Sequence, residues 1–269
     1  MLSKLIKHEL RATSRPILPL GAAMVAYALL YRLLTALHLT RQWPNLDQTL
    51  AGLGLTFFVL LMAACGLIGT FLLVSRYYHS LYTDEGYLMN TLPVTPGELI
   101  WSKLLTAFLW SVFLTLSGIV AVLAAAAGTA TFREVVGGLA DAIAQGWQML
   151  RFDPPLRAVI VSELVLLILL SPLAGFLRFY AAISLGQLMR GHRLLGAVAC
   201  YFALNFAFSL VAALLMMVTG GLGVNLFSSV APSAAVAVAW GYALGIVVVE
   251  GVVYFLISQW GLSKKLELE

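Results

Sequence analysis

The sequence predicts an all-α, polytopic membrane protein with six transmembrane helices. Three observations predict this class: 61% of the 269 residues are hydrophobic, only 10% are charged, and the mean hydropathy is +0.96. Soluble domains are about 45–50% apolar and about a quarter charged, and their single cores stop growing near ~250–300 residues. A soluble chain of this length therefore cannot bury so much apolar surface. A cytosolic enzyme, a disordered chain and a disulfide-stapled secreted domain are all excluded.

Six segments have the ~20 apolar residues that a helix needs to cross a bilayer core of about 30 Å. The spans are predicted at about 17–37, 50–74, 104–127, 158–188, 194–220 and 236–259. The fourth is longer than a bilayer requires, and Pro172 predicts a kink within it. We expect one transmembrane domain over the whole chain, 1–269.

Basic residues near the span ends predict the orientation. Ten Lys and Arg residues lie on the side of the two termini, against four on the other side. Cytoplasmic loops carry such an excess, so we expect both termini in the cytoplasm. The net charge of +4 reflects the same bias and does not indicate a nucleic-acid partner. Cys65 and Cys200 lie in apolar stretches and indicate neither a disulfide nor a metal site.

The N-terminal segment 1–15 has the pattern of an amphipathic helix that lies in the cytoplasmic interface. Its apolar residues share one helical face: Leu2, Leu5, Ile6 and Leu10. Lys4, Lys7 and Arg11 lie elsewhere on the helix, and Pro16 begins the first span. The alternative is a frayed basic tail that only sets the topology.

Two external connections each admit two interpretations. In 128–157, apolar residues recur at helical spacing, and Thr131 with Glu134 forms a capping box. We expect a helix that rests on the outer leaflet or roofs the bundle, although Gly137-Gly138 weakens it and a plain loop is the alternative. The uncharged segment 221–235 either dips into the outer leaflet or is an apolar loop.

The connection between the second and third spans, 75–103, is the most specific part of the sequence. Thr83 or Asp84 can cap a short helix, and Leu92-Pro93 ends it, because the residue before a proline is pushed out of the helical region. A bilayer does not require a loop this ordered. We therefore expect that a protein partner contacts it.

The same connection contains the start of the third helix. Thr95 and Glu98 predict a capping box, and Pro96 occupies the first helical position, where its missing N–H costs nothing. The third helix therefore begins well below the membrane, with Trp101 and Lys103 near the interface.

Ionisable residues inside the predicted spans are further candidates, because charges at this depth are costly and usually functional or paired. By the helix rise, Arg178 and Glu250 lie roughly 15 Å and 14 Å from the inner ends of their spans. We hypothesise that they pair inside the bundle and either lock the helices together or line a substrate path. Arg32 and Glu163, each roughly 8 Å from an outer span end, form a second possible pair, although snorkelling to the interface is the favoured interpretation for them.

The loop between the second and third spans resembles that of the permease subunits of bacterial ABC transporters of the ABC-2 type. The matching residues are Glu85-Gly86-Tyr87-Leu88, Met89-Asn90, Thr91-Leu92-Pro93 and Thr95-Pro96. The resemblance extends to the basic amphipathic N-terminus, the six spans and the ending Lys264-Lys265-Leu266. It carries no information about the substrate.

The resemblance implies one half of an ATP-driven transporter. Two permease subunits, either two copies of this chain or this chain with a paralogue, would sit in a bacterial plasma membrane on two cytoplasmic ABC ATPase subunits. Segment 83–92 would contain the coupling helix. The residues that would seat in the ATPase are Asp84, Glu85, Gly86, Tyr87, Leu88, Thr91, Leu92 and Pro93. ATP and Mg²⁺ would bind to the partner subunit.

The residues themselves offer no motif for catalysis by this chain. A P-loop needs Gly-Lys-Ser/Thr, yet none of the five lysines follows a glycine. His8-Glu9 opens like a zinc-protease motif, but the second histidine is missing, so one metal ligand cannot form. We therefore expect no metal, no bound cofactor and no enzyme activity in this chain, and ATP hydrolysis on a partner.

We expect the permease of an exporter for a lipid, a peptide or another amphipathic compound, because few polar residues are available to face a pathway. The first alternative is a secondary transporter driven by a proton or ion gradient. The second is an intramembrane enzyme, which needs a nucleophile–base pair or a metal cluster at bilayer depth. The sequence leaves the substrate, the direction of transport and the choice between homodimer and heterodimer open.

Overall fold

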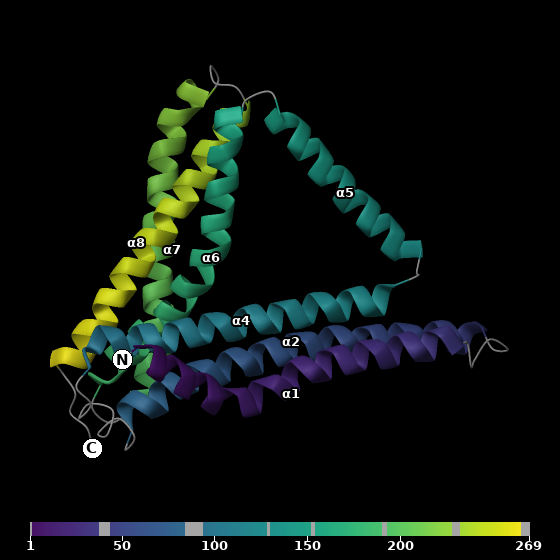
Figure 1. Cartoon of the computed structure of the whole chain (residues 1–269). Helices are drawn as coiled ribbons and strands as arrows, with labels where there is room; N and C mark the ends of the chain where they lie inside the picture. The colour runs from purple at the N-terminus through teal and green to yellow at the C-terminus, as the bar shows by residue number, and fades with distance from the viewer. Residues whose placement is uncertain are drawn as a thin grey trace. The chain divides into compact units, whose positions relative to one another are not determined.

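The structure is a computed structural model that describes residues 2–37, 44–83, 94–127, 130–151, 154–189, 193–227 and 232–264. Within these ranges the chain forms helices, and no strand occurs among them (Figure 1). The helices are α1 (Leu2–Leu37), α2 (Pro44–Tyr82), α4 (Pro96–Ala126), α5 (Ala130–Arg151), α6 (Pro154–Gly186), α7 (Arg193–Phe227) and α8 (Pro232–Lys264). The all-α class predicted from the sequence is confirmed.

Six of the described helices are long and apolar enough to cross a membrane. The qualifying segments are Leu2–Leu37, Thr49–Tyr82, Pro96–Ala126, Leu156–Gly186, Arg193–Leu215 and Ala237–Ser263. They agree with the predicted number of spans and indicate a multi-pass membrane protein. Their surfaces carry large apolar side chains, such as Leu67 and Phe71 of α2, which are 73% and 70% exposed. Lipid tails are as apolar as these side chains and can cover them.

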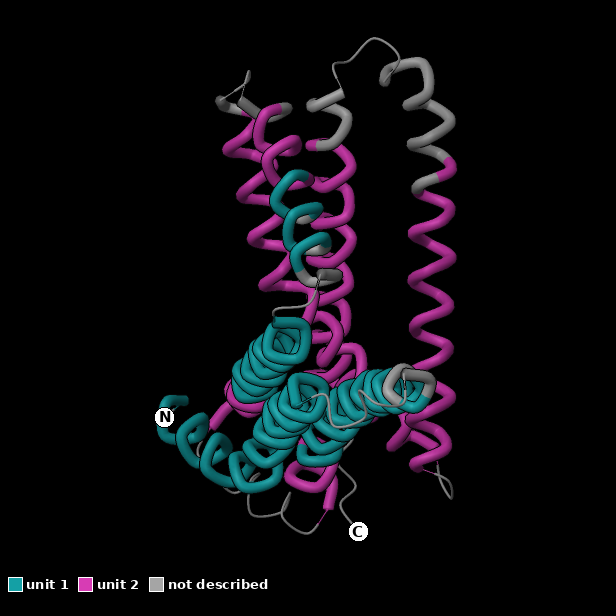
Figure 2. The backbone as a smooth tube through the Cα atoms, turned by 90° about the vertical axis from the view of Figure 1, so that its right-hand side faces the viewer, with its two compact units in different colours: residues 1–76, 105–141 teal, residues 77–104, 142–269 magenta. Residues whose placement is uncertain are grey.

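The first helix differs from the sequence prediction. A separate interfacial helix over 1–15 was expected, but α1 runs without a break from Leu2 to Leu37 and contains Pro16 and Pro19. A proline inside a helix removes one backbone hydrogen bond and kinks the helix. In Figures 1 and 2 the first part of α1 points in a different direction from the rest of the helix. The N-terminal segment thus has its own direction, and its location in a membrane interface stays a prediction.

Both connections for which the sequence admits two interpretations, 128–157 and 221–235, contain helix. Residues 130–151 form α5, so the helix interpretation of 128–157 holds over that range. Thr131, the expected cap, lies one residue inside α5, a difference within the usual uncertainty of helix ends. In 221–235, α7 continues to Phe227 and α8 begins at Pro232.

The chain divides into two compact units, which Figure 2 shows in different colours. Unit 1 comprises residues 1–76 and 105–141, and unit 2 comprises residues 77–104 and 142–269. Helices α2, α4 and α5 therefore contribute to both units. The ends of α2 and α4 next to segment 84–93 belong to unit 2, and α5 divides between Asp141 and Ala142. The single transmembrane domain expected over 1–269 stays a prediction.

Unit 1 is built from α1, α2 and α4 around an apolar core. The buried residues of this core are Met24, Ala28, Phe58, Cys65, Ala121 and Ala125. Polar side chains add links between the helices. Trp110 Nε1 of α4 donates to Thr13 Oγ1 of α1 at 2.7 Å, and Arg76 Nε of α2 donates to Glu9 Oε2 of α1 at 3.4 Å. Buried polar groups in an apolar environment need such partners.

Helices α1 and α4 approach closely at Gly21. A Cβ placed on Gly21 would lie 2.6 Å from Phe113 Cε1 and 2.8 Å from Ser117 Oγ of α4. Both distances are far shorter than a normal van der Waals contact. Small residues at such crossings allow close approach of a neighbouring helix, so Gly21 makes room for the Phe113 ring and the Ser117 hydroxyl of α4.

Unit 2 is built from α6, α7 and α8, together with the ends of α2 and α4. Helix α6 continues through Pro172 and packs against both α7 and α8. Helices α6 and α7 approach closely at Gly186, where an added Cβ would lie 2.5 Å from the backbone nitrogen of Ala197. Tyr242 Oη of α8 donates to the carbonyl of Ala212 in α7 at 3.1 Å. All three helices are thus joined within the unit.

The close approach at Gly21 predicts a destabilised Gly21→Ala variant. Overpacking of this kind typically costs about 1–3 kcal/mol, and we expect a lower midpoint of thermal unfolding in detergent. Gly66→Ala is the matched control, because nothing lies within 4 Å of an added Cβ at Gly66 and alanine is the better helix former. Equal midpoints for the two variants would contradict the tight crossing.

Candidate functional site

An ion pair between Arg178 and Glu250 joins α6 and α8 within unit 2. Arg178 Nη2 of α6 donates to Glu250 Oε1 of α8, as the matched depths in the sequence predict. Arg178 Nη1 also donates to Asn205 Oδ1 of α7 at 2.8 Å. The Glu250 side chain is only 9% exposed and that of Arg178 is 24% exposed. One guanidinium thus joins the three helices of the unit.

Aromatic side chains surround this ion pair. The Arg178 guanidinium carbon lies 5.9 Å from the centre of the Tyr254 ring, and the ring of Phe208 lies 5.0 Å from that of Tyr254. A cation over an aromatic face gains further stabilisation when it is removed from water. Arg178 Nε and Tyr254 Oη are both buried without a hydrogen-bond partner among the described residues. The cluster therefore has hydrogen-bonding capacity beyond the ion pair.

The second predicted pair has a different outcome. Arg32 belongs to unit 1 and Glu163 to unit 2, and their pairing stays a prediction. Within unit 2, Glu163 packs against α8 at Gly241, where an added Cβ would lie 2.8 Å from Glu163 Oε1. Glu163 Oε2 is buried without a hydrogen-bond partner among the described residues.

The sequence does not predict the contact between Glu163 and Gly241. Its signal was the four-residue spacing of Ala237, Gly241 and Gly245 on α8, which marks a face open to close approach. That spacing does not say which residue approaches, so it indicated general helix packing only.

The residues expected to contact an ATPase lie outside the described residues. These residues are Asp84, Glu85, Gly86, Tyr87, Leu88, Thr91, Leu92 and Pro93. The structure does describe both sides of this segment. After it, Thr95 N donates to Glu98 Oε2 at 3.0 Å, Glu98 N donates to Thr95 Oγ1 at 3.3 Å, and α4 begins at Pro96. The predicted capping box is present.

Before the segment, the end of α2 is docked on α6. The rings of Tyr77 and Tyr180 stack with their centres 3.8 Å apart, and both side chains are almost fully buried. Five residues further along α2, Tyr82 Oη and Ser184 Oγ are hydrogen-bonded at 2.7 Å. Ser184 lies one turn beyond Tyr180 and six residues beyond Arg178. The end of α2 is therefore attached to the helix that holds the arginine of the ion pair.

After the segment, the start of α4 is docked on α8. The rings of Trp101 and Phe255 lie 5.7 Å apart, and an added Cβ on Gly97 would lie 3.8 Å from Phe255 Cζ. Phe255 follows Glu250 by five residues on α8. Lys103, which was expected near the interface, is buried. Both sides of segment 84–93 are thus anchored on the helices that carry Arg178 and Glu250.

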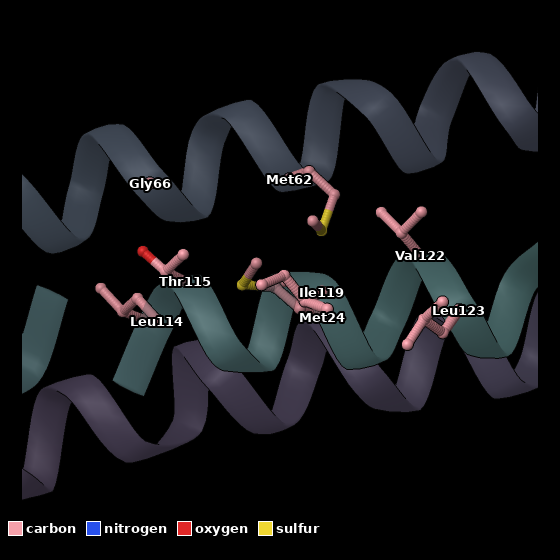
Figure 3. Close-up of a pocket in the computed structure, with 9 residues that line it drawn as sticks. Met24, Met62, Gly66, Leu114, Thr115, Ile119, Val122 and Leu123 are labelled. Carbon is pink, nitrogen blue, oxygen red and sulfur yellow. The ribbon is translucent and has the colours of Figure 1, made fainter. Parts of the chain in front are cut away.

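Each unit also contains an apolar cavity. In unit 1, a groove of about 470 Å³ runs between the helices and is lined by side chains such as Met24, Met62 and Leu123 (Figure 3). The two methionines lie over Gly118, with Met62 Cε 3.1 Å and Met24 Cε 3.3 Å from the position of an added Cβ. In unit 2, a cavity of about 310 Å³ lies among α4, α6 and α8 and includes Trp101 in its lining. Their linings suit an apolar ligand.

Comparisons with protein-family models, with curated proteins and with solved structures find no match for this chain. Among the described residues, no group of three or more His, Cys, Asp or Glu side chains is placed to hold a metal ion.

The ion pair predicts strong coupling between Arg178 and Glu250. Glu250→Met or Arg178→Met leaves the other charged side chain without its partner. Breaking a buried pair in this way costs about 3–5 kcal/mol, and we expect less here because the Arg178 side chain is 24% exposed. The double variant Arg178→Met with Glu250→Met should regain most of this loss. The single and double variants form a double-mutant cycle. The free energies of unfolding, measured by denaturant titration in mixed micelles, give the coupling between the two residues. Additive single effects would show that the two residues do not interact.

The anchor on α6 predicts a local effect of Tyr82→Phe. Loss of a hydrogen bond worth about 1 kcal/mol should raise local opening about fivefold. Faster amide hydrogen exchange over residues 77–83, with other helices unchanged, measures it. Tyr78→Phe is the control on the same helix. It removes a tyrosine hydroxyl but keeps the ring that contacts His79 and Tyr82. Similar exchange in both variants would argue against the anchor.

Proposed function

We propose that this chain is the permease subunit of an ATP-driven transporter in a bacterial plasma membrane. It acts as one half of a dimer, with both termini in the cytoplasm, and couples through segment 83–92 to a separate ABC ATPase subunit. The observation that carries the proposal is the anchoring of both sides of this segment on α6 and α8, through Tyr82 with Ser184 and Trp101 with Phe255.

The anchors give the proposed coupling a physical route. A displacement of segment 83–92 would reach α6 through the stacked rings of Tyr77 and Tyr180, and α8 through Phe255. The two helices meet again at Arg178 and Glu250. A directional hydrogen-bonded ion pair has a narrow range of good geometries, so a shift of α6 along α8 would break it. In this proposal the pair distinguishes two states of the transporter.

The cavities favour an apolar or amphipathic substrate. The groove in unit 1 and the cavity in unit 2 are lined almost wholly by hydrocarbon and aromatic side chains. Hydrophobic linings with few polar groups are typical of sites for apolar ligands. We therefore favour the export of a lipid, a peptide or a similar amphipathic compound. ATP and Mg²⁺ bind to the partner subunit in this proposal.

A gradient-driven secondary transporter is the second candidate. The observation that favours it is Glu163, whose Oε2 is buried without a hydrogen-bond partner among the described residues. Ionisable groups within membrane spans form the proton relays of such transporters. An intramembrane enzyme is the third and least supported candidate.

Co-expression with a candidate ABC ATPase tests the proposal. The purified chain should carry the ATPase with it, and Glu85→Ala or Tyr87→Ala should abolish this complex while the chain still inserts into the membrane. Glu134→Ala on α5 is the control, since it removes an exposed carboxylate far along the chain from the segment. Transport by proteoliposomes that contain this chain without an ATPase, driven by a proton gradient, would favour the second candidate and overturn the first.

A further inference from the structure

Helix α5 has an exposed apolar face. It is the one described helix that does not qualify as a membrane span. The large apolar side chains that the structure describes on it are uncovered, with Val136, Ile143 and Trp147 being 42%, 71% and 52% exposed. At 100° per residue, positions 136, 143 and 147 fall within about 40° of one another. The three side chains therefore form one narrow stripe along the helix.

The opposite face of α5 is polar. Its exposed side chains include Glu134, Asp141, Gln145 and Gln148. These positions lie about 120–180° around the helix from Val136 by the same rotation. A helix with this division presents one side to water and the other to an apolar environment.

The connections of α5 fix its location near a membrane surface. Helix α4 ends at Ala126 and α5 begins at Ala130, while α5 ends at Arg151 and α6 begins at Pro154. Connections of this length reach at most about 14 Å and 11 Å. Both neighbours are candidate spans. The two ends of α5 must therefore lie close to the same face of the membrane, and a helix of 22 residues, about 33 Å long, then runs along that face.

A cation–π contact places Trp147 beside the start of a span. The guanidinium carbon of Arg157, in the first turns of α6, lies 5.2 Å from the centre of the Trp147 ring. Tryptophan is enriched at membrane–water interfaces, where its ring contacts lipid and its N–H contacts water. The contact brings the apolar stripe of α5 to the depth at which α6 enters the bilayer.

We propose that α5 binds the surface of a phospholipid leaflet, with Val136, Ile143 and Trp147 inserted at the boundary of the acyl chains and Asp141 facing water. The occupant of the apolar stripe is lipid rather than another protein surface. Interfacial helices of this kind bind through buried apolar area. This inference does not depend on the proposed transport function.

Site-directed spin labelling of the full chain tests this arrangement. Nitroxides are attached to Ile143→Cys or Asp141→Cys in a chain with Cys65→Ala and Cys200→Ala, in nanodiscs of phosphatidylcholine and phosphatidylglycerol. Collisions with oxygen, which concentrates in lipid, are compared with collisions with a water-soluble nickel chelate. We expect a depth parameter that is positive at 143 and negative at 141. A negative value at both sites, or shielding of 143 from both reagents, would overturn the proposal.

A second measurement keeps the cysteines and so does not depend on those variants. In nanodiscs that contain brominated lipid, part of the tryptophan fluorescence is quenched by contact with bromine. The Trp147→Phe variant should lose a share of this quenchable fluorescence. An unchanged quenchable share would show that Trp147 does not contact lipid. Shielding of 143 together with an unchanged quenchable share would indicate a protein surface, such as a second copy of the chain, on the stripe.

Discussion

The cost of placing charge inside a bilayer is the constraint on which unit 2 depends. Arg178 and Glu250 lie in candidate membrane spans, where charge is costly, and their ion pair offsets this cost. Since Arg178 also donates a hydrogen bond to Asn205, the polar partners of its guanidinium come from both α7 and α8. Apolar packing between membrane helices is not directional, whereas this hydrogen-bonded group fixes how the three helices face one another.

The neighbouring aromatic contacts attach two further helices, α2 and α4, to the group that Arg178, Asn205 and Glu250 form. Tyr77 and Tyr82 attach the end of α2 to α6 near Arg178, and Trp101 attaches the start of α4 to α8 near Glu250. The described residues on both sides of segment 84–93 are thus attached to the helices that Arg178 and Glu250 join. Unit 1 has a different basis, because glycines such as Gly21 allow its helices to approach closely around an apolar core.

The features that the sequence predicts are those set by the bilayer or by local chemistry. The spans follow from bilayer thickness, the capping box at Thr95 and Glu98 from residues three apart, and the Arg178–Glu250 contact from equal depths. The stacking of Tyr77 on Tyr180 was not predictable, because residues 103 apart leave no spacing signal. The continuation of α1 through Pro16 was not predictable, because a proline can begin a helix or lie within a bent one.

The passage of α2 from one unit into the other has a mechanical consequence. Arg76 is tied to Glu9 within unit 1, while the next residue, Tyr77, is stacked on Tyr180 within unit 2. Successive residues of one hydrogen-bonded helix therefore have their contacts in different units, without a flexible linker between them. A helix that is continuous across this boundary has no freely rotating backbone dihedrals there, so the contacts of Arg76 and of Tyr77 cannot rearrange independently of one another.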